Sequence, residues 1–321
     1  MKKYILSVII SVLCIGSVFS QFDPNYTQYM LNPSAYNPAA VGESDMIQLG
    51  WQPRLQWMHM DSVSQDMVTH NITLHTPLKI GNSLHGVGVR LLSDNFGLFS
   101  ASTVSLQYAY KMKLDAGLLS LGLNAVVVQV GFLGTKATST IGLGSYYDFA
   151  SDVAIPKTDV VGSNLDLGVG AYYSTKRFYA GISYAHLNNP QIRWNNTSEF
   201  PLLGTMYLSG GYTFEGADPK LMIKPSGLFR TDFRSFQIEL SGIAEYDQKY
   251  WGGVSYRFQN ALALLAGINY SSFSFGVSYD VPVTSQLSYK TNLGTLEALV
   301  IYNFAYVFAK KNTKYKSIRI L

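Results

Sequence analysis

Residues 103–111 read Thr-Val-Ser-Leu-Gln-Tyr-Ala-Tyr-Lys, with large apolar side chains at every second position over most of the segment. A helix repeats every 3.6 residues and would mix the apolar and polar side chains, whereas a β-strand places them on opposite faces. The segment therefore predicts a strand with one apolar and one polar face. The apolar face carries Val104, Leu106, Tyr108 and Tyr110, and the polar face carries Thr103, Ser105, Gln107 and Lys111.

The same two-residue period recurs along the chain after residue 46. Residues 165–174 and 178–184 are two such segments joined by a short turn, which is the pattern of a β-hairpin. The sequence predicts fourteen strands, an even number that suits a bacterial barrel with both chain ends on the periplasmic side. The predicted strands are residues 48–57, 68–75, 86–91, 103–111, 119–127, 165–174, 178–184, 206–214, 221–223, 237–246, 250–257, 261–269, 272–280 and 294–304.

The lengths of the predicted connections agree with a barrel in the outer membrane. Counted from the first strand, the three long connections, residues 131–163, 187–203 and 281–293, are all odd-numbered, and every even-numbered connection is short. Outer-membrane barrels have short periplasmic turns and longer extracellular loops. The odd connections are therefore expected to face outward.

The composition separates a membrane barrel from a soluble β-sandwich or propeller, whose strands also alternate. Only 14% of the residues are charged, compared with about 25% in soluble domains. The polar rows are rich in glycine, where a soluble surface would carry long Lys and Glu side chains. We therefore expect an all-β fold, a transmembrane antiparallel β-barrel with a narrow interior. The polar-row glycines are Gly86, Gly88, Gly122, Gly168, Gly170, Gly181, Gly211, Gly253, Gly267 and Gly276.

The two ends of the chain differ from the alternating region. Residues 1–20 contain Lys2, Lys3 and then an apolar run too short to span lipid, which is typical of a cleavable signal peptide. Residues 21–46 are expected to form a leader, 47–308 the barrel, and 309–321 a basic tail. The only cysteine, Cys14, lies in the signal, so disulfides and thiolate chemistry are excluded from the expected mature chain.

Charged residues on the polar rows should point into the barrel. Isolated charges in such an interior would be costly, so a network of salt bridges is expected, although the same residues could line a pore. These residues are Arg54, Arg90, Lys111, Asp166, Glu239, Glu245, Arg257, Asp280 and Glu297.

The chain gives little indication of catalysis. It has neither a Gly-x-Ser-x-Gly elbow nor a phosphate-binding loop, and we expect no enzyme activity and no cofactor. Five histidines are present, but His70 and His75 fall on opposite faces of one predicted strand, so no metal site is expected. Without the two lysines of the signal, 22 basic residues face 20 acidic ones, and this balance gives no reason to expect a nucleic-acid partner.

The leader mixes aromatic residues with turn formers and shows no alternation. Its two Asn-Pro pairs predict turns. It is interpreted either as a plain periplasmic extension or plug, or as a docking segment for a periplasmic partner. The docking candidates are Asp23, Pro24, Gln28, Tyr29, Asn32, Pro33, Tyr36, Asn37 and Pro38.

The leader and several later motifs resemble the PorP/SprF family of type IX secretion membrane proteins. The resemblance covers nearly the whole chain after the signal and is most specific in the leader. The matching segments are Gln21-Phe-Asp-Pro-Asn-Tyr-Thr-Gln-Tyr-Met30, Asn32-Pro33, Tyr36-Asn37-Pro38-Ala39, Arg54-Leu-Gln-Trp57, Gly86-Val-Gly-Val89, Asp94-Asn-Phe-Gly97, Gln107-Tyr-Ala-Tyr110, Lys224-Pro225, Trp251-Gly-Gly-Val-Ser-Tyr-Arg257 and Ser278-Tyr-Asp-Val-Pro282.

This resemblance implies an outer-membrane component of the type IX system of Bacteroidetes, in contact with outer-membrane lipid. Its expected partners are periplasmic lipoproteins of the secretion ring and a secreted surface adhesin, whose export or attachment it would support. The alternatives are an outer-membrane channel for small or hydrophobic molecules, which fourteen strands could enclose, and a simple surface adhesin.

Overall fold

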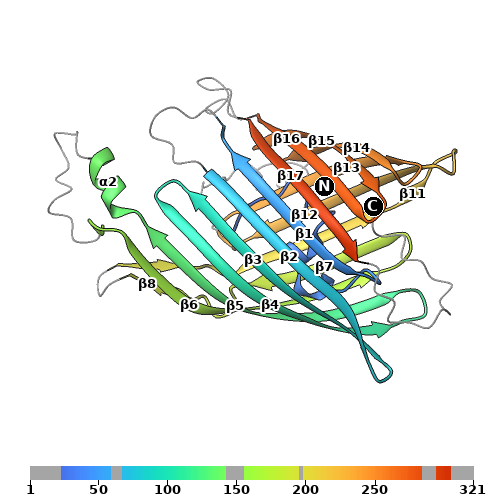
Figure 1. Ribbon diagram of the computed structural model, residues 1–321, viewed down its shortest axis with the longest axis horizontal. Coiled ribbons are helices and arrows are strands. Elements are labelled where there is room, and N and C mark those ends of the chain that lie inside the picture. Colours follow the sequence, from blue (N-terminus) through green and yellow to red (C-terminus); the bar gives the residue numbers. More distant parts are fainter. Residues whose placement is uncertain (1–22, 59–66, 142–154, 195–197, 284–293, 305–321) are drawn as a thin grey trace, which may run out of the picture.

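The computed structural model describes residues 23–58, 67–141, 155–194, 198–283 and 294–304. The expected signal peptide and the basic tail lie outside these residues. Fourteen strands form one closed antiparallel barrel, because β1 pairs with β17 and β10 pairs with both β7 and β12 (Figure 1). The predicted fold and strand number are therefore confirmed.

The barrel strands differ in length around the wall. Those in the first half of the chain reach 14 or 15 residues, whereas β7 and β10 have 8 each. The barrel strands are β1 (Ile47–Gln56), β2 (Met67–Ile80), β3 (Ser83–Phe96), β4 (Phe99–Lys113), β5 (Leu118–Phe132), β6 (Val160–Ser174), β7 (Phe178–Ala185), β10 (Thr205–Tyr212), β12 (Leu221–Thr231), β13 (Phe236–Tyr246), β14 (Tyr250–Arg257), β15 (Ala261–Tyr270), β16 (Phe273–Pro282) and β17 (Thr295–Phe304).

Most strands extend beyond their predicted bounds, by five residues at one end of β2, β3, β5 and β6, and β10 and β12 differ further. The segment predicted as residues 206–214 ends as β10 at Tyr212, and a separate two-residue strand, β11 (Phe214–Glu215), pairs with β12. β12 itself runs eight residues beyond the predicted end at Ile223. Pro225 and the small residues after it interrupt the periodicity there, yet they stay in the ladder because Pro225 lies opposite Gly242.

The barrel is apolar outside and polar inside. Leu165 and Leu264 on the outward rows are 66% and 64% exposed, whereas Gln52 and Glu297 on the inward rows are fully buried. The apolar outer surface is the face that meets acyl chains in an outer-membrane barrel. Among the described residues, no helix is both long and apolar enough to cross a membrane.

The long connections carry further structure at one end of the barrel, away from the short turns (Figure 1). They hold the helix α2 (Gly134–Ile141) and a hairpin of β8 (Gln191–Arg193) and β9 (Glu199–Pro201). Ile192 of this hairpin packs on Val128 and Val130, which lie on the inward row of β5. The outer end of the lumen is therefore partly filled by the chain itself.

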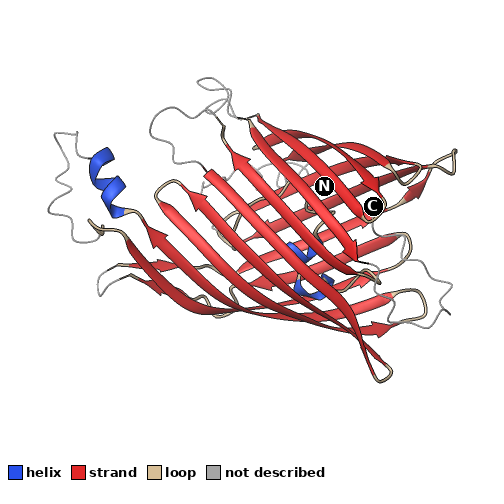
Figure 2. Ribbon diagram, in the orientation of Figure 1, coloured by secondary structure: helices blue, strands red, loops and turns tan. Residues whose placement is uncertain are grey.

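Residues 23–44 lie inside the barrel, and the exposed Asp45 and Met46 connect them to β1. They contain two short 3-10 helices, η1 (Pro33–Ala35) and η2 (Pro38–Ala40), each starting at the proline of an Asn-Pro pair. Figure 2 shows these two helices within the ring of strands. η2 contacts the inner faces of β4, β5 and β6. Residues 23–44 therefore occupy the lumen, and we call them the plug.

Candidate functional site: the plugged lumen

The plug packs directly onto bare strand backbone. A Cβ atom at Gly122 would overlap the backbone of Ala39, and one at Gly86 would overlap the carbonyl of Val41. Glycine in a strand interior often marks a site where another backbone approaches closely. The glycine-rich inward rows predicted a crowded interior, and at these two positions the plug occupies the space that a side chain would need.

Asn37 fixes the middle of the plug. Its side-chain oxygen accepts a hydrogen bond from the N–H of Ala39 at 2.9 Å, which caps η2. Its amide nitrogen donates to the backbone carbonyls of Ala171 on β6 and Ile182 on β7, at 3.0 and 3.2 Å. One side chain thus shapes the plug and attaches it to the wall.

Five of the predicted inward charges form one buried cluster. Arg54 donates to Asp280 at 2.8 Å and to Glu297 at 2.9 Å. Arg257 donates to Glu239 at 2.9 Å and to Asp280 at 3.2 Å. All five side chains are at most 5% exposed, so each charge depends on its partners instead of on water.

The plug is part of this cluster. The backbone N–H groups of Thr27 and Gln28 each donate to a carboxylate oxygen of Glu297 at 2.9 Å. The Thr27 hydroxyl donates to Asp280 at 2.7 Å and accepts from both arginines, at 3.2 and 3.1 Å. The carboxylates of Glu297 and Asp280 therefore accept hydrogen bonds from the plug as well as from the arginines.

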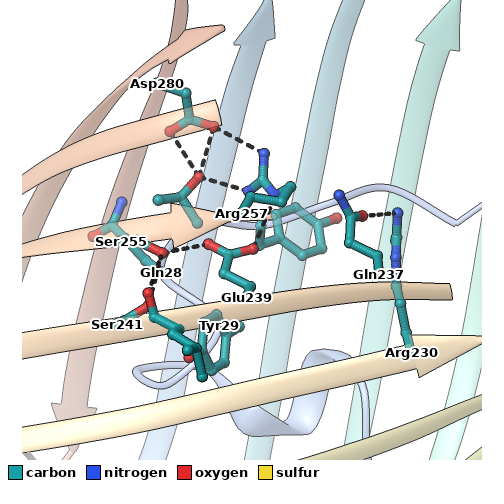
Figure 3. Close-up of polar contacts among 12 residues, drawn as sticks. Gln28, Tyr29, Arg230, Gln237, Glu239, Ser241, Ser255, Arg257 and Asp280 are labelled. Atoms are coloured by element: carbon teal, nitrogen blue, oxygen red, sulfur yellow. Dashed lines mark hydrogen bonds and ion pairs between the residues drawn. The ribbon is translucent and has the colours of Figure 1, made fainter. Parts of the chain in front are cut away.

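Hydrogen bonds through neutral side chains extend the cluster along the wall (Figure 3). Ser255 donates to Glu239 at 2.7 Å and accepts from Ser241 at 2.8 Å. Nearby, Arg230 donates to Gln237 at 2.8 Å. These contacts join β12, β13 and β14 on their inward faces.

A second charged group holds the start of the plug near the outer end of the barrel. His186, just after β7, contacts Asp166 at 2.8 Å and Asp23 at 3.3 Å. The Tyr207 hydroxyl also donates to the Asp23 carboxylate, and Arg230 donates to the Asp23 carbonyl at 3.2 Å. This group attaches the plug to β6, β7, β10 and β12.

Burial and charge act in opposite directions on the pKa values of this group. Burial alone would lower the pKa of His186, but the charge of Asp23 and the hydrogen bonds to Asp166 and Asp23 outweigh it and raise the pKa to about 10. Burial alone would raise the pKa of Asp23, and the charge and hydrogen bond of His186 bring it well below its usual range. Both residues are therefore charged at neutral pH.

Three other predicted inward charges lie apart from the main cluster. Arg90 donates to Asn71 at 2.7 Å. Lys111 lies 3.7 Å from Glu43 at the end of the plug. Glu245 pairs with Lys224 at 3.0 Å. The remaining predicted charge, Asp166, belongs to the His186 group.

The nine docking candidates of the leader lie inside the barrel, and most of them contact its wall. Gln28, Tyr29, Asn32 and Asn37 are at most 5% exposed. Asp23 and Tyr36 form hydrogen bonds within the lumen, with His186 and Ser183 among their partners. Pro24, Pro33 and Pro38 line small cavities between the plug and the wall.

Sequence reasoning missed four charged groups of this site, among them Lys224, the partner of Glu245. Arg230 lies beyond the predicted end of its strand, so no inward row was extended to it. His186 lies beyond the predicted end of its strand at residue 184, and Glu43 belongs to a segment without periodicity. Continuing the two-residue period from Lys224 through Pro225 would have placed Arg230 on the inward row.

Within the described parts of the chain, no group of three or more His, Cys, Asp or Glu side chains could hold a metal ion. A recess of about 110 Å³ opens at the short-turn end, between the plug and β12 to β14, and Met30, Pro33, Glu43, Lys224 and Glu245 line it. We call this recess the mouth recess.

The fold and the filled lumen define the class of protein: an outer-membrane β-barrel with an internal plug. The sequence profile of the type IX secretion system membrane protein PorP/SprF matches residues 18–302. The chain belongs to this family, as the leader motifs predicted. A comparison with curated proteins gave no match.

Solved structures with a similar fold are outer-membrane barrels. A mutant of the monoaromatic hydrocarbon channel TodX has a TM-score of 0.52 at 9% identity, covering 88% of this chain and 95% of that one. A FadL homologue of Pseudomonas aeruginosa has a TM-score of 0.48 at 12% identity, covering 89% and 96%. Omp33 of Acinetobacter baumannii has 0.47 at 7%, covering 82% and 100%. At these identities the likeness concerns the fold alone.

The buried cluster predicts a large effect of removing one carboxylate. Glu297→Ala should lower the free energy of unfolding by about 3–5 kcal/mol, because it removes one of the two carboxylates that pair with the buried Arg54 charge and leaves two plug N–H groups without their acceptor. Glu215→Ala is the control, since its pair with Arg177 is more than 60% exposed, and it should cost no more than about 1 kcal/mol. Urea unfolding in lipid vesicles measures both, and equal losses would contradict the assignment.

The His186 group predicts a pH dependence. The folded pKa of His186 lies above its unfolded value, so its charge contributes stability below about pH 6.5, and this contribution is lost as the pH rises toward 10. The difference in urea midpoint between the unsubstituted protein and His186→Gln should therefore be largest near pH 6 and shrink up to pH 10. A difference that is constant over this range would refute the charged pairing.

Proposed function

We propose that this chain is an outer-membrane anchor of a type IX secretion system, which holds periplasmic lipoproteins of the secretion ring to the membrane and supports export or surface attachment of an adhesin. The observation that carries this proposal is the plug, which the barrel holds through a buried charged cluster. A barrel that uses its lumen to bind its own leader is better suited to anchoring than to free conduction.

The periplasmic end offers the docking surface in this proposal. The even-numbered turns, which face the periplasm in such barrels, surround the mouth recess. Met30 and Pro33 give this recess an apolar part, and the Lys224–Glu245 ion pair gives it a charged part. A partner docked there would contact the plug and the wall together, so the leader would contribute to docking through its surface in the recess.

The outer end is where the proposal places cargo. α2 and the β8–β9 hairpin project from the long connections at that end, and the hairpin carries the exposed Arg193–Glu199 pair. The two ends of the barrel would then serve different partners, with the membrane wall between them.

The docking proposal predicts a one-sided pattern of crosslinks in cells of the native host. A photo-crosslinking amino acid at Asp115, exposed in the turn between β4 and β5, should capture a periplasmic component of the secretion system. The same group at Arg193 of the β8–β9 hairpin is the matched control and should not. Mass spectrometry identifies the crosslinked proteins. Capture of a periplasmic component from position 193 and not from position 115 would reject periplasmic docking.

A conductance measurement separates the anchor from the alternative, a channel for small or hydrophobic molecules. The full chain in planar bilayers should show no steady conductance, because the plug fills the lumen. A variant lacking residues 23–38 should conduct, provided that heat-dependent gel migration shows it to be a folded barrel. Steady conductance by the full chain would favour the channel.

A further inference from the structure

Three small residues lie side by side on the lipid-facing wall. Ala180 of β7 pairs with Gly210 of β10, which pairs with Gly227 of β12. All three belong to the outward rows, which elsewhere carry leucine, valine and aromatic residues. They leave a depression of about 650 Å³ in the outer surface. Its border is formed by Tyr173, Ile182, Leu208, Phe229 and Leu240.

A side chain at either glycine would need its neighbour to shift by only a few tenths of an ångström. A Cβ atom at Gly210 would meet only the carbonyl oxygen of Tyr179, at 3.3 Å, and one at Gly227 would come nearest to a methyl group of Leu240, also at 3.3 Å. The inward Gly86 and Gly122 differ, because plug backbone occupies the space beside them. The depression is therefore a space that the chain leaves open toward the membrane.

The shape of the depression favours an extended hydrocarbon chain. Ile182 and Leu208 flank the small row on one side, and Phe178 and Tyr212 flank it on the other, each two residues away along a strand. On each strand the two flanking residues are four positions apart, so their Cα atoms lie about 13 Å from each other. The side chains of the flanking residues narrow this spacing further, so a helix of about 10–12 Å diameter does not fit between them. The bordering side chains are hydrocarbon or aromatic, so they would solvate an acyl chain.

The position of the depression indicates which membrane leaflet it faces. It begins at Tyr173, and the rings of Tyr173 and Phe178 lie 5.5 Å apart beside the β6–β7 turn. This turn is short, so it lies on the periplasmic side, and aromatic residues mark the membrane interface there. It carries Lys176 and Arg177, and Arg177 lies three residues, or about 10 Å, from Ala180.

We propose that this depression binds one acyl chain of a phospholipid from the periplasmic leaflet, with the lipid phosphate beside Arg177. The Arg177 side chain lies at the rim of the mouth recess and is 62% exposed, and its contact with Glu215 is 3.4 Å long, so a phosphate at the membrane interface can reach it. The apolar slot and the cationic turn would thus recognise the two chemical parts of one lipid. This proposal is independent of the secretion role.

The test uses the full chain in nanodiscs that contain phosphatidylglycerol with a spin label on the acyl chain. Electron paramagnetic resonance then counts immobilised chains per barrel. Ala180→Leu and Gly210→Leu should each remove one immobilised chain, because they fill the depression. Gly242→Leu is the matched control: it is an outward glycine on β13, an added Cβ meets nothing within 4 Å, and it does not line the depression. It should leave the count unchanged.

A second comparison tests the head-group contact. The double variant Arg177→Gln with Glu215→Gln should weaken retention of the labelled phosphatidylglycerol and leave an equally labelled diacylglycerol, which lacks the phosphate, unaffected. Equal counts for the unsubstituted protein, Ala180→Leu and Gly210→Leu would overturn the proposal, as would an equal loss in Gly242→Leu. If the double variant retained the labelled phosphatidylglycerol as well as the unsubstituted protein does, the assignment to a phospholipid would be overturned. Heat-dependent gel migration establishes that each variant is folded.

Discussion

The structure depends on pairing charges inside a wall whose outer face is apolar. Arg54 and Glu297 lie opposite each other where the first and last barrel strands meet, and Asp280 and Arg257 extend the pairing to β16 and β14. Thr27 of the plug bonds to the same charges. Because a buried charge without a partner is costly, closing the barrel and seating the plug are stabilised by the same set of contacts.

The plug takes the place that water has in an open porin. Its N–H groups and the Asn37 amide satisfy carboxylates and strand carbonyls that would otherwise face an empty or hydrated lumen. Its apolar residues Met30 and Leu31 pack on Ile243 and Trp251. The interior therefore resembles a small protein core enclosed by a membrane wall, and this explains why glycine is frequent on the inward rows.

Because the lumen is filled, the candidate binding surfaces are the two ends of the barrel and its lipid-facing wall. The two ends of the barrel are chemically distinct, with short turns and a recess at one and a hairpin and helix at the other. The lipid-facing wall is also uneven, because Ala180, Gly210 and Gly227 open a depression above a cationic turn. In the roles proposed above, ring components, cargo and lipid each contact a different part of the barrel.

The sequence by itself determined the barrel, the strand number and the face of the residues within the predicted strands, because alternation is local: each side chain's face follows from its parity along the strand. It also identified the family, through the leader motifs. Only the tertiary structure decided which inward charges meet, since Arg54 and Asp280 are 226 residues apart, and that the leader enters the lumen. Those contacts depend on how distant strands are aligned when the barrel closes and on the path of a segment without periodicity, and neither follows from local sequence.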